Sequence, residues 1–139
     1  MDLGLTGKVA VITGGSDGIG KAAAISMSTE GAKVAIVSRT QAKLDSAVAD
    51  IQALTNGEVI GLSADVSVES EVQAMTNRVV SEFGQLDILV NNAGTSSATS
   101  LEKMTDKDLE IDFGIKVYGA IYCARAALPH LKVSGYGVI

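Results

Sequence analysis

The fold of this chain is decided by the stretch Thr13-Gly14-Gly15-Ser16-Asp17-Gly18-Ile19-Gly20. Residues 8–12 before it form a β-branched apolar run, which predicts a buried strand. Residues 21–28 after it are rich in alanine and predict a helix, and apolar residues recur at helical spacing in Ile19, Ala23 and Met27. Glycines let a backbone approach a ligand, and the unpaired N–H groups at the positive end of a helix bind phosphate. An ordinary strand-to-helix turn gives the same pattern, so the rest of the chain must supply the context.

Composition places the chain among globular proteins. It has 139 residues, a length sufficient for one domain with a hydrophobic core. Of these residues 47% are hydrophobic and 19% are charged, with one proline and no tryptophan. The formal net charge is −5, and lysine and arginine form no cluster. A surface that binds nucleic acid needs such a cluster to neutralise phosphates, so we expect no nucleic-acid partner.

Single copies of cysteine and histidine limit the redox and metal chemistry. Cys123 is the only cysteine, which excludes an intrachain disulfide and a cysteine-based zinc site. His130 is the only histidine, so we expect no metal, and we interpret both residues as helix-packing and helix-end positions. The first residues have no signal-peptide pattern, and no apolar run approaches the roughly 20 residues of a membrane span. We therefore expect a cytoplasmic protein that does not associate with membranes.

Strands and helices alternate along the rest of the chain. We expect further strands at 33–38, 58–63 and 86–90. We expect one helix at 41–54, a second that begins after Ser67 as its N-cap, and a long one over 105–131. Residues 95–103 are expected to form an irregular polar stretch. Asn56-Gly57 is typical of a left-handed helix C-cap, and Thr105 with Asp108 is typical of a capping box. Val138-Ile139 begins another strand. This order predicts an α/β fold with a doubly wound parallel sheet of the Rossmann type, whose ligands bind at the carboxyl ends of the strands.

The end of the second predicted strand indicates which dinucleotide would bind. The position about 20 residues after a glycine turn contacts the ribose 2′ position, and NAD sites place an acidic residue there. This chain has Ser38-Arg39 instead. A guanidinium can pair with a 2′-phosphate through two parallel bonds, which favours NADP(H), although a solvated arginine at a strand end would have the same sequence.

Together these residues resemble the short-chain dehydrogenases/reductases. The resemblance depends on Thr13-Gly14-x-x-x-Gly18-Ile19-Gly20, on Asp65-Val66 after the third strand and on Asn91-Asn92-Ala93-Gly94 after the fourth, in the order and spacing of the family. It implies that Asp65 binds the adenine edge beside Val66, and that the Asn-Asn-Ala-Gly segment borders the cofactor ribose. The cofactor-binding residues it implies are Gly14, Ser16, Asp17, Gly18, Ile19, Gly20, Ser38, Arg39, Asp65, Val66, Asn92, Ala93 and Gly94.

The chain departs from the family pattern in three places. Many NADP(H)-preferring relatives carry a basic residue where Asp17 stands, so Arg39 must supply most of the attraction for a 2′-phosphate. The family's catalytic Ser and its Tyr-x-x-x-Lys pair follow the fifth strand, and none of Tyr118, Tyr122 and Tyr136 has a lysine four positions later. We therefore expect a single dinucleotide-binding Rossmann domain over 1–139 that stops at the start of the fifth strand and is inactive in this form.

The third departure is Lys116, which stands where the resemblance places a catalytic Asn. It can be a substitute member of a proton relay, a buried charge, a sign of lost activity or a surface lysine that snorkels to water. Tyr118 and Tyr122 lie four apart on one helical face and are interpreted as packing or interface residues.

The resemblance predicts the NADP(H)-binding part of an oxidoreductase that interconverts alcohols and carbonyl compounds by hydride transfer. Its partners would be the dinucleotide, a small alcohol or carbonyl substrate if the full-length protein is active, and further copies of the chain in a homo-oligomer. The alternative is a non-catalytic nucleotide-binding or oligomerising interaction module.

Overall fold

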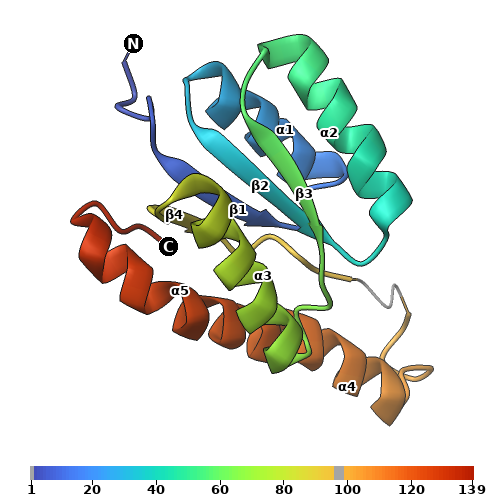
Figure 1. Cartoon of the computed structure of the whole chain (residues 1–139). Coiled ribbons are helices and arrows are strands. Elements are labelled where there is room, and N and C mark those ends of the chain that lie inside the picture. The colour runs from blue at the N-terminus through green and yellow to red at the C-terminus, as the bar shows by residue number, and fades with distance from the viewer. Residues whose placement is uncertain (1, 96–98) are drawn as a thin grey trace.

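The computed structural model describes residues 2–95 and 99–139, and its centre is a four-stranded parallel sheet in the order β3-β2-β1-β4 (Figure 1). The strands are β1 (Val9–Thr13), β2 (Lys33–Ser38), β3 (Val59–Ser63) and β4 (Ile88–Val90). The helices are α1 (Gly18–Thr29), α2 (Gln41–Thr55), α3 (Glu69–Phe83), α4 (Asp106–Phe113), the π-helical segment η1 (Gly114–Gly119) and α5 (Ala120–Ser134). The expected α/β fold with a Rossmann-type parallel sheet is confirmed.

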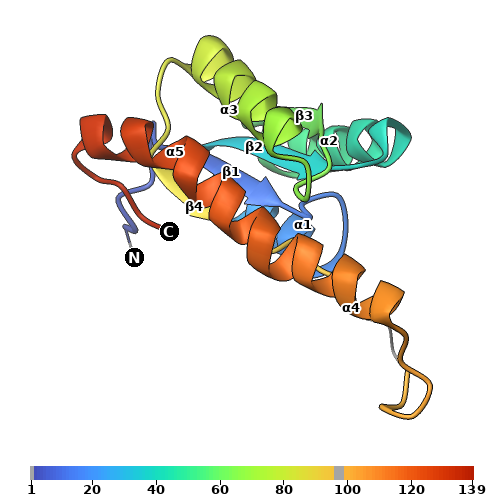
Figure 2. The same ribbon diagram turned by 90° about the horizontal axis from the view of Figure 1, so that it is seen from below.

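Helices cover both faces of the sheet because the strands are apolar on both faces. Side chains alternate along each strand: Val9 and Val11 of β1 pack toward α3 and α5, whereas Ile12 packs toward α1 and α2. Figures 1 and 2 show α3 and α5 lying side by side over one face, and the α4 end of the long helix extends past the sheet (Figure 2). The faces of α2 and α3 that pack on the sheet are apolar, with Leu44, Ala47, Ile51, Val72, Met75 and Val79 buried.

The first helix differs from the sequence-based expectation in its start and in its buried face. It begins at Gly18, because the Asp17 carboxylate caps it by accepting a hydrogen bond from the Gly18 N–H. The last three residues of the glycine stretch thus form its first turn. Gly20, Ala24 and Ser28 face the core, and Ile19 is 83% exposed, so the expectation that Ile19 belongs to the apolar face is wrong.

The helix caps confirm two of the three cap assignments. Asn56 ends α2 in the left-handed conformation with φ 52°, and Thr105 and Asp108 form the reciprocal capping box of α4. Ser67 is not an N-cap: Val68 holds that position before α3. The Ser67 hydroxyl donates instead to the Asp65 carboxylate at 2.6 Å, a competing local bond that the helical pattern could not reveal.

The expected long helix is continuous, but its middle is π-helical and its end lies at Ser134. After it the chain returns to the sheet, where Val138 forms a parallel bridge with Ile88 of β4, as expected for the start of a further strand. Residues 96–98 of the polar stretch lie outside the described residues. Within the described part, no helix is long and apolar enough to cross a membrane, and no group of three or more potential metal ligands lies together.

Candidate functional site

The carboxyl ends of the four strands surround a hollow of about 120 Å³. Residues from the ends of β1, β2, β3 and β4 meet there because the strands are parallel and end at one edge of the sheet. The hollow brings together Gly14, Ser38, Arg39, Asp65, Val66, Ala93 and Gly94 of the expected site, with Val37, Ala64, Thr95 and Ile115. The last four had no motif to mark them in the sequence.

Thr13 joins the β1 end of this site to the β4 end. Its hydroxyl is buried, donates to the Val90 carbonyl at 3.3 Å and accepts hydrogen bonds from the N–H groups of Asn92 and Ala93, each at 3.0 Å. The Asn92 side chain continues the connection by donating to the carbonyls of Thr13 and Gly14 at 3.0 and 3.1 Å. Asn92 therefore holds the glycine turn against the end of β4.

The glycines of the turn have two separate reasons to lack a side chain. A Cβ on Gly14 would lie 2.9 Å from the Asn92 amide nitrogen, and a Cβ on Gly20 would overlap the Gly14 carbonyl oxygen. These two glycines allow the turn to pack against its own neighbours. Gly18 has nothing within 4 Å of its Cβ position and a φ of +52°, so it faces open space with a backbone conformation that favours glycine.

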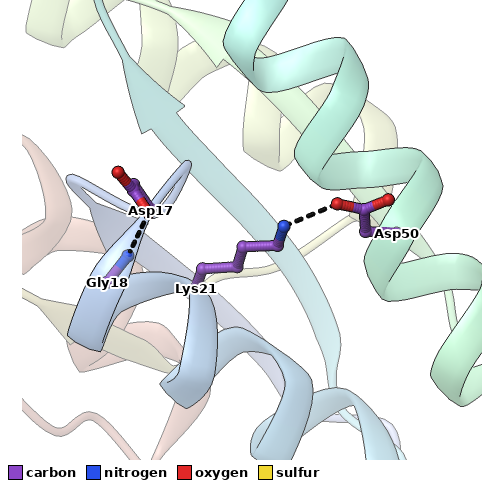
Figure 3. Close-up of polar contacts among 4 residues, drawn as sticks. All are labelled: Asp17, Gly18, Lys21 and Asp50. Carbon is purple, nitrogen blue, oxygen red and sulfur yellow. Dashed lines mark hydrogen bonds and ion pairs between the residues drawn. The ribbon is translucent and has the colours of Figure 1, made fainter.

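The Asp17 carboxylate caps its own helix by accepting from the Gly18 N–H (Figure 3), and Asp17 does not line the hollow that contains Arg39. With Ser16 it lines a separate hollow of about 340 Å³ on the α2 side of the turn, together with Lys21 and Lys43. The Lys21 ammonium binds Asp50 at 2.6 Å and so links α1 to α2 (Figure 3). Gly18, Ile19, Gly20 and Asn92 line neither hollow.

Ser38 presents an unpaired polar atom to the site. Ser38 lines the hollow beside Arg39, and its buried Oγ has no hydrogen-bond partner among the described residues. A buried hydroxyl without a partner is costly and marks a place where a ligand can supply one. A ribose or phosphate oxygen fits this requirement.

Asp65 is held as an anion at the β3 end of the hollow. The Ser67 hydroxyl bond lowers the pKa of this carboxyl most, burial opposes the shift, and the Ser67 N–H and Arg39 lower it further. Both bonds from Ser67 go to Oδ1, at 2.6 and 2.9 Å, which leaves Oδ2 to accept from a ligand. Glu71 accepts from the Asp65 backbone N–H at 2.7 Å and fixes the turn, a role that no sequence pattern indicated.

Lys116 lies in η1 and lines a neighbouring cavity of about 200 Å³ with Thr13, Asn91, Ala93 and Cys123. Its side chain is 50% exposed, so the interpretation of Lys116 as a buried charge is wrong. Cys123 is buried, which raises the pKa of its thiol to about 11 and keeps it protonated and unreactive. The rings of Tyr118 and Tyr122 lie 6.2 Å apart, and Tyr118 is largely exposed.

Comparison with known proteins gives relatives for both the sequence and the fold. A probable tetrahydroxynaphthalene reductase of Zymoseptoria tritici is 37% identical over 94% of this chain and 49% of its own. Meso-2,3-butanediol dehydrogenase of Serratia marcescens is 36% identical over 89% of this chain and 48% of its own. The chain thus spans about half the length of the curated relatives it matches.

Solved structures of a reductase and a dehydrogenase share the fold of this chain. L-Sorbose reductase from Gluconobacter frateurii, complexed with NADPH and L-sorbose, superposes with a TM-score of 0.91 at 37% identity over 97% of this chain and 51% of that chain. NAD+-bound xylitol dehydrogenase gives 0.90 at 29% identity over 96% and 51%. The family model described as short chain dehydrogenase matches residues 8–139, and this chain belongs to the short-chain dehydrogenase family.

Proposed function

We propose that this chain is the NADP(H)-binding part of an oxidoreductase that interconverts alcohols and carbonyl compounds. The observation that carries the proposal is the hollow at the strand ends, which Ser38, with its unpaired hydroxyl, lines together with Arg39 and Asp65. The bound nicotinamide would supply or accept the hydride, and this chain would bind and orient the dinucleotide.

Each part of the dinucleotide has a counterpart in the site. Asp65 and Val66 receive the adenine, because Oδ2 of Asp65 is placed to accept from an amino group. Ser38 and Arg39 receive the ribose and its 2′-phosphate. The exposed Gly18 at the start of α1 leaves space for the pyrophosphate at the positive end of the helix, and Ala93-Gly94 borders the ribose.

The charges at the site support NADP(H) over NAD(H). Among the described residues that line the hollow, Asp65 is the one with a carboxylate, and Ser67 engages it, while Asp17 caps α1 and does not line the hollow. L-Sorbose reductase is complexed with NADPH and xylitol dehydrogenase with NAD+, so family membership alone does not decide the cofactor. The guanidinium of Arg39 is the argument for the 2′-phosphate.

The proposal also includes the association of this chain into a homo-oligomer. Leu109, Phe113, Val117 and Ile121 recur every four residues along α4, η1 and α5, and each is at least 42% exposed. Such an apolar stripe favours packing against a second copy. Nucleotide binding without catalysis is the alternative function, and it would use the same hollow.

Replacing Arg39 with alanine tests the cofactor assignment. We expect Arg39→Ala to weaken NADPH binding about 10- to 100-fold, the loss of a charge-assisted bond, and to leave NADH binding nearly unchanged. Isothermal titration calorimetry with both cofactors measures the difference. Arg78→Ala, which removes an exposed arginine of α3, is the matched control. Equal losses for NADPH and NADH would contradict the assignment.

The two kinds of glycine should respond differently to alanine. Gly20→Ala should lower the free energy of unfolding by more than about 2 kcal/mol, because its methyl group would overlap backbone. Gly18→Ala should cost only about 1 kcal/mol of backbone strain while weakening NADPH binding. Urea denaturation and calorimetry separate the two effects. Unchanged affinity in folded Gly18→Ala would show that the pyrophosphate lies elsewhere.

The 139-residue chain should not reduce carbonyl compounds. A positioned general acid contributes about 10² to 10⁴ in rate, and none of the three tyrosines has a lysine four positions later in the sequence. A panel of ketones with NADPH, followed by loss of absorbance of the reduced cofactor, checks this. Turnover by a sample whose intact mass confirms 139 residues would refute the expectation.

The oligomer should depend on the apolar stripe. We expect light scattering to give a mass above that of one chain, and Val117→Glu to shift it toward the monomer, because a charge cannot be buried between two apolar faces without a partner. Val133→Glu, at an 88% exposed position of α5, is the control and should leave the mass unchanged. A monomeric unmodified protein would exclude the association.

A further inference from the structure

The π-helical segment η1 packs closely on the turn that follows β3. Ile115 is 9% exposed, and a Cβ on Gly119 would lie 2.8 Å from Cγ2 of Val66. Such segments are rare, and they occur frequently at functional sites. Lys116 lies between these two packed positions in the sequence, and it lines the cavity of about 200 Å³.

A chain of polar contacts holds Lys116 at the β4 end of the site. Thr95, in the loop after β4, donates to Oδ1 of Asp112 at 2.7 Å, and the Lys116 ammonium lies 4.0 Å from Oδ2 of the same carboxylate. The Cε atom of Lys116 lies 3.5 Å from the Cβ position of Gly94. The ammonium is therefore tethered beside Gly94, which the proposed function places next to the cofactor.

Two hollows adjoin beneath η1. The hollow that contains Arg39 and Asp65 and the cavity that contains Lys116 share Val66, Ala93 and Ile115 in their walls. Among the described residues that line the second cavity, Lys116 is the one with a charge. A dinucleotide whose adenosine half occupies the first hollow and which continues past Ala93 brings its other half to this ammonium.

We propose that Lys116 contacts the cofactor and binds the phosphate and ribose of its nicotinamide mononucleotide half. The inference depends on the proposed function, since it needs a dinucleotide in the first hollow. It gives Lys116 a binding role in place of the proton relay and of the free surface lysine considered from the sequence. Asp112 is a positioning residue, because its carboxylate holds the ammonium near Gly94.

Two ligands separate the halves of the cofactor in a test of this role. NADPH contains the nicotinamide mononucleotide half, and adenosine 2′,5′-bisphosphate lacks it. We expect Lys116→Met to weaken NADPH binding about 3- to 10-fold, a modest change because the lysine is half-exposed, and to change the bisphosphate affinity less than about twofold. Lys116→Arg should retain the NADPH affinity, and Lys116→Met should reduce the salt dependence of NADPH binding.

Controls and outcomes distinguish this inference from the proposed function. Lys107→Met removes an exposed lysine from α4, away from both hollows, and should leave both affinities unchanged. If the unmodified protein binds the two ligands but Lys116→Met binds NADPH as tightly, or loses both ligands equally, the role of Lys116 is refuted while the cofactor site stands. If the unmodified protein binds neither ligand, the proposed function fails and the inference fails with it.

Discussion

The hydroxyl of Thr13 is the contact on which the rest of the site depends. It connects the ends of β1 and β4, which are 77 to 80 residues apart in sequence, through bonds to Val90, Asn92 and Ala93. Buried backbone N–H groups need partners, and here one side chain supplies the acceptor for two of them. With the strand ends fixed, Asn92 can hold the glycine turn, and the hollow beside Arg39 and the cavity beside Lys116 form on the two sides of Ala93.

The site presents the positive charge of Arg39, although the chain as a whole is negatively charged. The net charge is −5, but the acids nearest the site are engaged by internal donors: Asp17 by the Gly18 N–H, Asp65 by Ser67 and Asp112 by Thr95. The bonded oxygen of each of these carboxylates is directed toward its internal donor. Arg39 and the start of α1 therefore remain able to attract an anion in an acidic protein.

Local patterns predicted the elements, and long-range contacts decided what the patterns missed. Periodicity located β2 without error and the other strands to within two residues, since buried parallel strands are short apolar runs. The prediction of Ser67 as a helix N-cap was wrong, because the Ser67 hydroxyl bonds to Asp65 instead of capping α3. The motifs named the hollow's Arg39 and Asp65, whereas Thr95 and Ile115 reach it only through folding. No local signal marks η1 as π-helical, and its Gly119 packs on Val66, a residue that only folding brings close to it.

The position of Lys116 shows how the fold accommodates a charge in the middle of its long helix. A fully buried ammonium would need strong compensation, but this side chain is half in solvent and has Asp112 within 4.0 Å. Its stem lies along Gly94, where a larger residue would leave less room for it. Lys116 thus places a cation at the ends of the strands while the buried positions of the same segment, Ile115 and Gly119, maintain the packing. Its consequences should therefore appear in ligand binding and not in the stability of the sheet.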